Sequence, residues 1–320
     1  MSGKRLGLVV AFGLTALVMI YLSHALPRLL PGDFVTAMYA SSHVTLTSEQ
    51  EAELRAYYTS NENFAQYLVS LACLDWGYSY AFLTPVSELI LEALPWTLLL
   101  LGGAQVISIL LGFAAGVEAA WRHEAKLEKG MVGTMTLFEG VPEISTGIIL
   151  LSVFAFNLEW FPAAGADTAY AQFSLWQSLV DVTWHLALPL VTLVLAYLPG
   201  NFLLTRNSMI MVIKEPFITT ARGKGLAARR IKFSHAARNA LLPVVTRVGM
   251  RLSFVVTGAL VIETLFSYPG LGTLLFNAIQ NRDLPLIQGI VLVSSLLVLV
   301  VNFALEMIYL IIDPRIENAY

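Results

Sequence analysis

Charged residues are scarce in this chain. Lysine, arginine, aspartate and glutamate make up 13% of its 320 residues, against about 25% in a typical soluble domain. Hydrophobic residues make up 57%, and the mean hydropathy is +0.71. A soluble fold of this length could not bury so much apolar surface and keep a polar coat. The composition therefore excludes an ordinary soluble enzyme and a disordered chain, and it predicts a polytopic membrane protein.

Cysteine is nearly absent as well. Cys73 is the single cysteine, which excludes an intrachain disulfide and a disulfide-stabilised scaffold. The five histidines are scattered without the spacing of metal ligands, so we predict no metal site. The net charge of −3 does not suit a polyanion binder, and we predict no nucleic acid partner.

Catalytic and nucleotide-binding motifs are missing too. The pattern G-x-x-x-x-G-K-[S/T] binds nucleotide phosphates, and Gly223-Lys224-Gly225 has neither its spacing nor a preceding strand. An intramembrane enzyme would need a nucleophile with a histidine, or paired aspartates, and we find neither pattern. We therefore expect a chain that is not an enzyme and binds no cofactor, so that any ATP is used by partner subunits.

Apolar stretches long enough to cross a bilayer recur along the chain. A bilayer core of about 30 Å requires about 20 apolar residues in a helix. The sequence predicts an all-α fold with six transmembrane helices, over residues 6–26, 96–117, 144–158, 186–205, 252–262 and 286–312. The third extends back towards Met131 if Glu139 and Glu143 are tolerated, and the fifth extends back towards Val244.

Basic residues are distributed unevenly around these spans. If the N-terminus is cytoplasmic, all but three of the 19 lysines and arginines lie on the cytoplasmic side, and the exceptions are Arg28, Arg55 and Arg282. Because loops rich in lysine and arginine stay in the cytoplasm, we predict that both termini are cytoplasmic. The first span also resembles a cleavable signal peptide, but its apolar run is long for one, which favours retention.

These spans divide the chain into four regions. Residues 1–30 hold the first helix, 31–95 form an extracytoplasmic region, 96–312 form a five-helix core, and 313–320 form a cytoplasmic tail. The extracytoplasmic region is acidic and has two predicted short helices, one starting at Thr47 or Ser48 and one within 60–74. It is either a small cap or a docking surface for an extracytoplasmic partner.

The cytoplasmic loop at 206–243 is long and basic. The sequence predicts a short helix over residues 214–222, with Pro216 in its first turn. Gly223 and Gly225 interrupt this helix, and a second helix is predicted over residues 227–242. A basic loop can merely reflect membrane orientation. A helix–glycine–helix arrangement instead favours a rigid surface that contacts another molecule.

Motifs in this loop resemble the EAA loop of ABC importer permeases. They are T-T-A-R-G-K-G-L at 219–226 and H-A-A-R-N-A-L-L-P at 235–243. They are similar to those of the branch that includes dipeptide, oligopeptide and nickel permeases, and Gly225 lies where that loop has its glycine. Thr219 replaces the glutamate of the general motif, and Pro216 and Ala237 also depart from the branch.

The resemblance extends over nearly the whole chain. Further matching segments are P-G-D at 31–33, D-W-G-Y-S at 75–79, W-F-P at 160–162, Glu263 with F-S-Y-P-G-L-G at 266–272, R-D-L-P at 282–285 and D-P-R at 313–315. The resemblance implies the type I ABC importer permease fold in a bacterial inner membrane. It also implies a second homologous permease subunit in a heterodimer, two cytoplasmic ATPase subunits and an extracytoplasmic substrate-binding protein, with lipid around the spans.

The function that the resemblance implies is ATP-driven import by alternating access. The substrate would be a peptide or a related small solute such as a nickel chelate. An ion-gradient-driven secondary transporter is the alternative, and the long basic loop argues against it because such a transporter has no ATPase to dock. The resemblance places the coupling to the ATPases at Glu215, Thr219, Thr220, Ala221, Arg222, Gly223, Lys224, Gly225, Leu226, His235, Arg238, Asn239 and Pro243.

Other polar residues are weaker candidates. Glu139 and Glu143 are four residues apart, hence on one helix face, where they line a pathway or lie among lipid headgroups. Asn302 and Glu306 have the same spacing in the sixth span, where they line the pathway or form hydrogen bonds between helices. Residues 229, 230 and 232 are basic and contact either acidic ATPase surface or lipid headgroups.

Overall fold

The computed structural model describes residues 3–29, 35, 47, 50, 53–54, 63–73, 75–241, 243–244 and 255–312. Helices form the regular secondary structure of these residues, apart from one isolated antiparallel bridge between Tyr78 and Pro85. The described part of the chain therefore confirms the all-α fold. It separates into two compact units, Met1–Thr97 with Ser253–Leu260 and Pro269–Tyr320, and Leu98–Leu252 with Val261–Tyr268.

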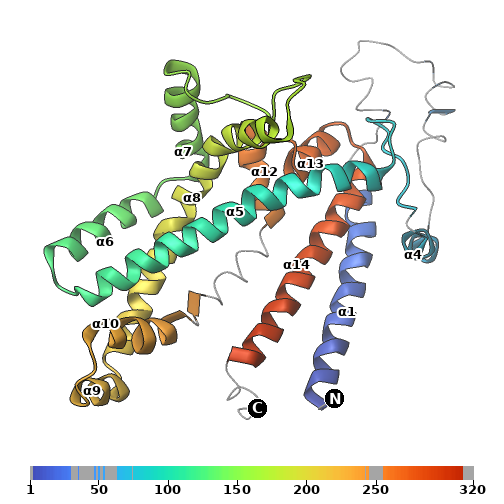
Figure 1. Cartoon of the computed structure of the whole chain (residues 1–320). Coiled ribbons are helices and arrows are strands. Elements are labelled where there is room, and N and C mark those ends of the chain that lie inside the picture. The colour runs from blue at the N-terminus through green and yellow to red at the C-terminus, as the bar shows by residue number, and fades with distance from the viewer. Residues whose placement is uncertain are drawn as a thin grey trace. The chain divides into compact units, whose positions relative to one another are not determined.

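The first unit contains both ends of the chain. Its helices are α1 (Gly3–Ala25), the short η1 (Pro27–Leu29), α4 (Phe64–Ala72), the first turns of α5 (Val86–Trp121), α13 (Leu271–Gln280) and α14 (Leu284–Ile312). Helices α1 and α14 run side by side (Figure 1), and the rings of Phe12 and Phe303 meet edge to face with their centroids 5.2 Å apart. Helix α4 begins at Asn63, whose side chain forms a reciprocal capping box with Gln66, and it confirms the short helix predicted within 60–74.

Asp283 joins two motifs that lie far apart in the sequence. Its carboxylate is fully buried and accepts hydrogen bonds from the Ser79 hydroxyl at 2.6 Å and from the Ala81 N–H at 3.0 Å. It also accepts one from the Leu286 N–H at 3.3 Å, in the first turn of α14. A carboxylate in that position caps the helix N-terminus. Asp283 therefore fixes the segment around Ser79 to the start of the last helix.

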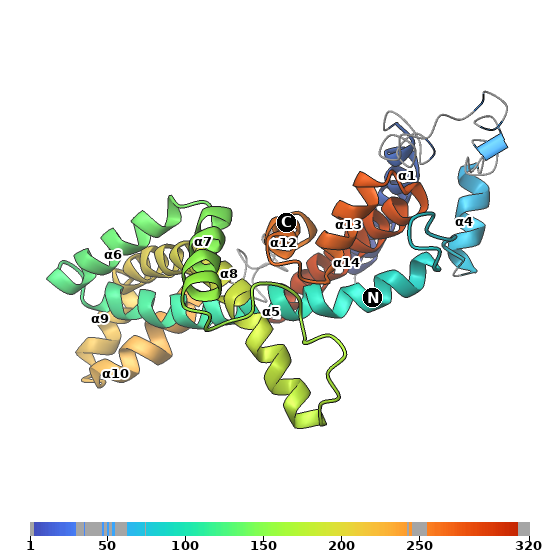
Figure 2. The same cartoon turned by 90° about the horizontal axis from the view of Figure 1, so that it is seen from above.

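The second unit is built around the C-terminal part of α5 and the whole of α8. Its elements are the rest of α5, α6 (Lys126–Glu139), α7 (Glu143–Leu150), the π-helical η2 (Leu151–Asn157), α8 (Leu175–Ile213), α9 (Pro216–Gly223), α10 (Ala228–Arg230), the π-helical η3 (Ile231–Ala237) and the end of α12 (Val255–Leu265). Figure 2 shows α6 and α7 beside the middle of α8, while the first turns of α8 extend away from them.

Glycines let α5 approach α8 closely within this unit. A Cβ atom at Gly116 would lie 2.7 Å from the Thr205 Cβ and 2.8 Å from the Phe202 carbonyl oxygen, and one at Gly112 would lie 2.9 Å from the Asn201 Cβ. The Asn201 amide also donates a buried 3.1 Å hydrogen bond to the Ser108 hydroxyl on α5. Small residues four apart are typical of tight helix contacts in membranes.

Among the described residues, three helices are long and apolar enough to cross a membrane, and the bent pair α6 and α7 would make a fourth if it is one span. The three are Val86–Trp121 and Leu175–Ile213, which contain the second and fourth predicted spans, and Leu284–Ala304, which covers most of the sixth. A shorter apolar helix, Val10–Ala25, coincides with the first. Residues 245–254 lie outside the described residues, and they include most of the predicted extension of the fifth span and the first three residues of that span.

The third predicted span needs a correction. Helices α6 and α7 meet at an angle of 94°, so the third span does not continue back to Met131 as one straight helix. Together the two helices are apolar enough to form a broken span or a re-entrant loop. The bend has a local cause, because Pro142 has no N–H to donate and its ring disfavours the helical conformation at Val141. Helix α6 accordingly ends at Glu139, with Gly140 as its C-cap.

Candidate functional site

The loop at 206–243 contains the two helices that its sequence predicts. Helix α8 continues through Ile213, and α9 follows after Glu215, with Pro216 as its first residue. The second helix, called here the second loop helix, comprises α10, η3 and helical residues as far as 241. The loop is therefore ordered by its own backbone hydrogen bonds.

The two glycines between these helices have different roles. Gly225 has a φ of +70°, which is in the left-handed region that favours glycine, and its N–H donates to the Arg222 carbonyl at 2.9 Å. A Cβ atom at Gly225 would have nothing within 4 Å, and the same holds at Gly223. Gly223 is the last residue of α9 and has no positive φ. Only Gly225 is thus required by the backbone of the turn.

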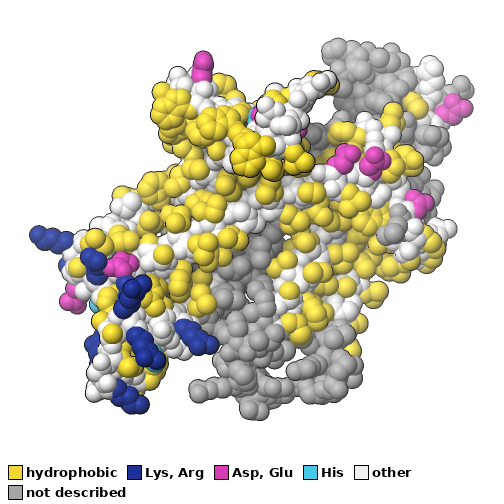
Figure 3. Space-filling view, in the orientation of Figure 1, with side chains coloured by type: hydrophobic (Ala, Val, Ile, Leu, Met, Phe, Trp, Pro, Cys, Tyr) yellow, Lys and Arg dark blue, Asp and Glu magenta, His cyan; other side chains and the backbone are white. Residues whose placement is uncertain are grey.

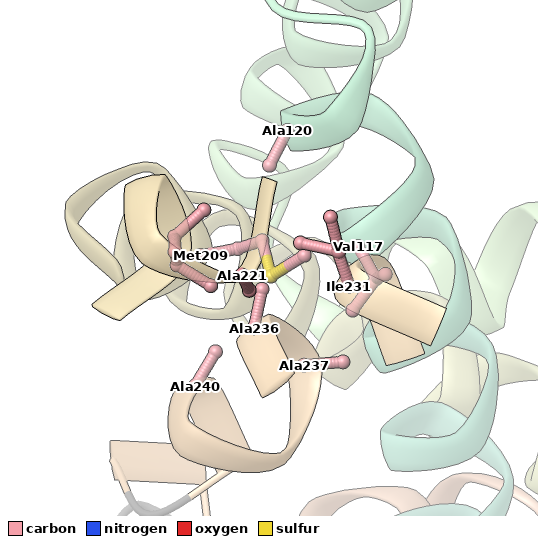
Figure 4. Close-up of a cluster of buried hydrophobic side chains, with 9 residues drawn as sticks. Val117, Ala120, Met209, Ala221, Ile231, Ala236, Ala237 and Ala240 are labelled. Atoms are coloured by element: carbon pink, nitrogen blue, oxygen red, sulfur yellow. The ribbon is translucent and has the colours of Figure 1, made fainter. Parts of the chain in front are cut away.

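One face of the loop is buried against α5 and α8. Figure 4 shows the cluster of apolar side chains that joins them, and its buried members are Val117, Ala120, Met209, Ile218, Ala221, Ile231, Ala236, Ala237 and Ala240. Leu226 packs at the edge of this cluster. This buried apolar contact packs both loop helices against the C-terminal ends of α5 and α8. Among the predicted site residues, Ala221 and Leu226 thus face the bundle.

The opposite face of the loop is exposed. It carries the side chains of Glu215, Phe217, Thr219, Thr220, Arg222 and Lys224. The Thr220 hydroxyl donates to the Pro216 carbonyl at 3.1 Å. Further along, Arg238 and Asn239 are exposed as well, whereas His235 and Pro243 are half-buried. The structure therefore brings most of the predicted residues to the surface of two adjoining helices.

Basic side chains gather at this end of the second unit, as Figure 3 shows. Arg229 and Arg230 are exposed, in keeping with the expected contact with an acidic surface or with lipid. Lys232 differs from them because it is only 8% exposed and forms an ion pair with Glu118 of α5. The expectation that Lys232 contacts an ATPase or lipid is therefore wrong, because its ammonium group is used inside the unit.

A second ion pair joins α6 to α8. Glu128 is 2% exposed and accepts hydrogen bonds from the Nε and from one terminal guanidinium nitrogen of Arg206. Its carboxylate also accepts from the Glu124 N–H at 2.7 Å, and His123 Nδ1 lies 3.2 Å away. Glu128 lies in the segment 121–130, which is predicted to be cytoplasmic. The hydrogen bonds from Arg206 lower the pKa of Glu128 to about 2, against the opposing effect of burial.

Sequence reasoning missed both of these ion pairs. Glu118, Glu128 and Arg206 lie just outside the predicted spans, where charged residues are expected near lipid headgroups. No spacing rule connects residues so far apart in the chain. Gly112 and Gly116 carried a usable signal for the contact between α5 and α8, because they form a small-x-x-x-small pattern.

The two pairs of candidate pathway residues differ in the structure, because Glu139 and Glu143 lie on separate helices whereas Asn302 and Glu306 lie on one. Glu139 is the last residue of α6 and Glu143 the first of α7, so the 94° bend between these helices removes the shared helix face. Asn302 is half-buried on α14. The side chain of Glu306 lies outside the described residues.

Comparison with known proteins identifies the family. Residues 108–318 match the family described as "Binding-protein-dependent transport system inner membrane component". The chain belongs to this family. It is therefore a membrane permease component of an ABC importer, and the alternative of an ion-driven secondary transporter is not supported.

Similar permeases match this chain over nearly its full length. The oligopeptide transport system permease protein AppB of Bacillus subtilis is 35% identical over 300 residues, which cover 92% of this chain and 93% of that protein. The di/tripeptide transport system permease protein DppB of Pseudomonas aeruginosa is 33% identical and covers 98% of both chains. The oligopeptide transport system permease protein OppB of Salmonella typhimurium is 32% identical and covers 95% of both. The permease is accordingly not an enzyme, and partner ATPases hydrolyse the ATP.

Proposed function

We propose that this permease imports peptides, as one of two homologous permease subunits that line the pathway. The names of the three relatives above all describe peptide transport, which favours peptides over nickel chelates. An extracytoplasmic binding protein delivers the peptide, and alternating access carries it across the inner membrane. The chain itself binds no cofactor. Both of its termini lie in the cytoplasm, on the side of the basic loops.

The 206–243 loop is the coupling element of this proposal. The proposal rests on the two different faces of the loop. One face, around Thr219 to Lys224, is exposed, polar and basic, and the other is apolar and packs on α5 and α8. An ATPase that docks on the exposed face moves the whole loop. The apolar face then carries the ends of α5 and α8 with it. Two arrangements of the spans, biased by ATP binding, then give inward and outward openings.

Reconstitution tests this function. Proteoliposomes that contain the permease with its co-purified subunits and binding protein should take up a labelled tripeptide mixture only with ATP at the ATPase side. The purified permease alone should hydrolyse no ATP. Uptake driven by a proton gradient without ATP would contradict the proposal, and uptake of a labelled nickel chelate in place of tripeptides would correct its substrate.

A further inference from the structure

Lys232 is an unusual residue for the surface of a cytoplasmic loop. Its side chain is 9% exposed, and its ammonium group donates to the carboxylate of Glu118, whose side chain is 37% exposed. A buried ammonium group loses its hydration, and this loss is offset only by a well-placed partner. Lys232 can therefore stay buried against α5 without a large penalty only while Glu118 is there to receive its ammonium group.

The apolar contact beneath this pair does not fix the register by itself. Four of its nine buried members, at positions 120, 236, 237 and 240, are alanines of α5 and the second loop helix. Apolar attraction has no direction, and methyl groups on facing helices allow one helix to slide along the other. A charge-assisted hydrogen bond has a fixed geometry. The Glu118–Lys232 pair therefore sets the position of the second loop helix along α5, which the apolar cluster alone does not determine.

We propose that Glu118 and Lys232 are positioning residues that lock the second loop helix to the inner end of α5. Displacement of the loop by the ATPase subunits then moves α5 by the same amount instead of letting the loop slide along it. This inference rests on the proposed function, because it assigns the link through which the loop reaches a membrane-spanning helix. The contact between α6 and α8 through Glu128 and Arg206 belongs to the same rigid end of the unit.

The structure also indicates which substitution tests the link most cleanly. Glu118 accepts a second hydrogen bond, at 2.5 Å, from the Nε of Arg122 one turn further along α5. In Lys232→Met this carboxylate keeps a charged partner, and the methionine still fills the site of the lysine stem. Glu118→Gln would instead leave the buried ammonium group without a carboxylate, so that its failure could be one of folding. Lys129→Met is the matched control, because Lys129 is exposed on α6 and lies outside the 206–243 loop.

The experiment measures tripeptide uptake and ATP hydrolysis in the same proteoliposomes, which contain the whole transporter. In Lys232→Met the ATPase subunits should remain bound and hydrolyse ATP, while the number of tripeptides moved per ATP falls about tenfold, within the range of coupling energies between sites. Lys232→Arg keeps a cation for Glu118 and should restore the ratio. Lys129→Met should match the wild type. An unchanged ratio in Lys232→Met, a proportional loss of binding, hydrolysis and uptake, or no rescue by arginine would overturn the proposal.

A cross-link provides a second, independent test should Lys232→Met fail to assemble. Glu118→Cys with Lys232→Cys, in a Cys73→Ser background, replaces the ion pair by two thiols that a short bifunctional maleimide can join. The joined form should transport more tripeptide per ATP than the unjoined form, because the lock is restored. A cross-link that blocks uptake would show that the helices must slide past each other, and it would overturn the inference. If the proposed function itself is wrong, vesicles with the wild-type transporter will show no ATP-dependent uptake. That result would contradict both the proposed function and this inference.

Discussion

At the scale of single residues, the backbone conformation at position 225 requires glycine, whereas the space around it does not. Its φ is +70° and a Cβ atom would meet nothing, so a β-branched residue costs about 1–3 kcal/mol through strain alone. Because the spans do not use this turn, we expect Gly225→Val to insert normally but to lose ATPase co-purification and peptide uptake. Gly225→Asn should keep more of both, since asparagine tolerates this conformation. Gly223→Val is the control, and equal losses in both valine variants would contradict the assignment.

Glu128 provides a prediction about stability and pH. In Glu128→Gln the Arg206 guanidinium loses its charged partner, and we expect a loss of about 1.5–3 kcal/mol. Since Arg206 lowers the pKa of Glu128 from 4.5 to about 2, the pair contributes fully above pH 4.5. Its contribution is lost as the pH falls from 4.5 towards 2. Thermal unfolding in detergent should therefore show a difference between wild type and variant that shrinks below pH 4.5. The exposed Glu124→Gln is the control, and a difference that is constant with pH would refute the assignment.

At the scale of helices, the close contact of α5 with α8 depends on Gly116. A methyl group there would lie within 3 Å of both Thr205 and the Phe202 carbonyl oxygen, and overpacking of this kind costs about 1–3 kcal/mol. We expect Gly116→Ala to lower the melting temperature of the purified permease. Gly102→Ala lies on the same helix but has nothing within 4 Å, and it should be neutral. Similar melting temperatures for the two variants would exclude a tight contact at Gly116.

Helix positions could be predicted where composition decides them. Apolar length was enough for α5, α8 and α14, and the glycines and Pro216 were enough for the two loop helices. The bend between α6 and α7 was missed because a hydropathy pattern does not register the effect of Pro142 on the residue before it. The Glu118–Lys232 pair was missed for another reason, since it joins residues 114 positions apart. Local patterns hold no information on which distant side chains will meet.

At the scale of the whole molecule, the motifs of the sequence define the family, while the orientation in the membrane remains a prediction from the basic residues. Cys73 offers a direct test, because it is the only cysteine of the chain, is exposed and lies in the region 31–95, which is predicted to be extracytoplasmic. We expect a membrane-impermeant maleimide to label it in intact spheroplasts. In a Cys73→Ser chain, Thr219→Cys should be labelled only after the membrane is opened, because the 206–243 loop is predicted to be cytoplasmic. The reverse pattern would invert the topology and place the proposed coupling face on the side where no ATPase could reach it.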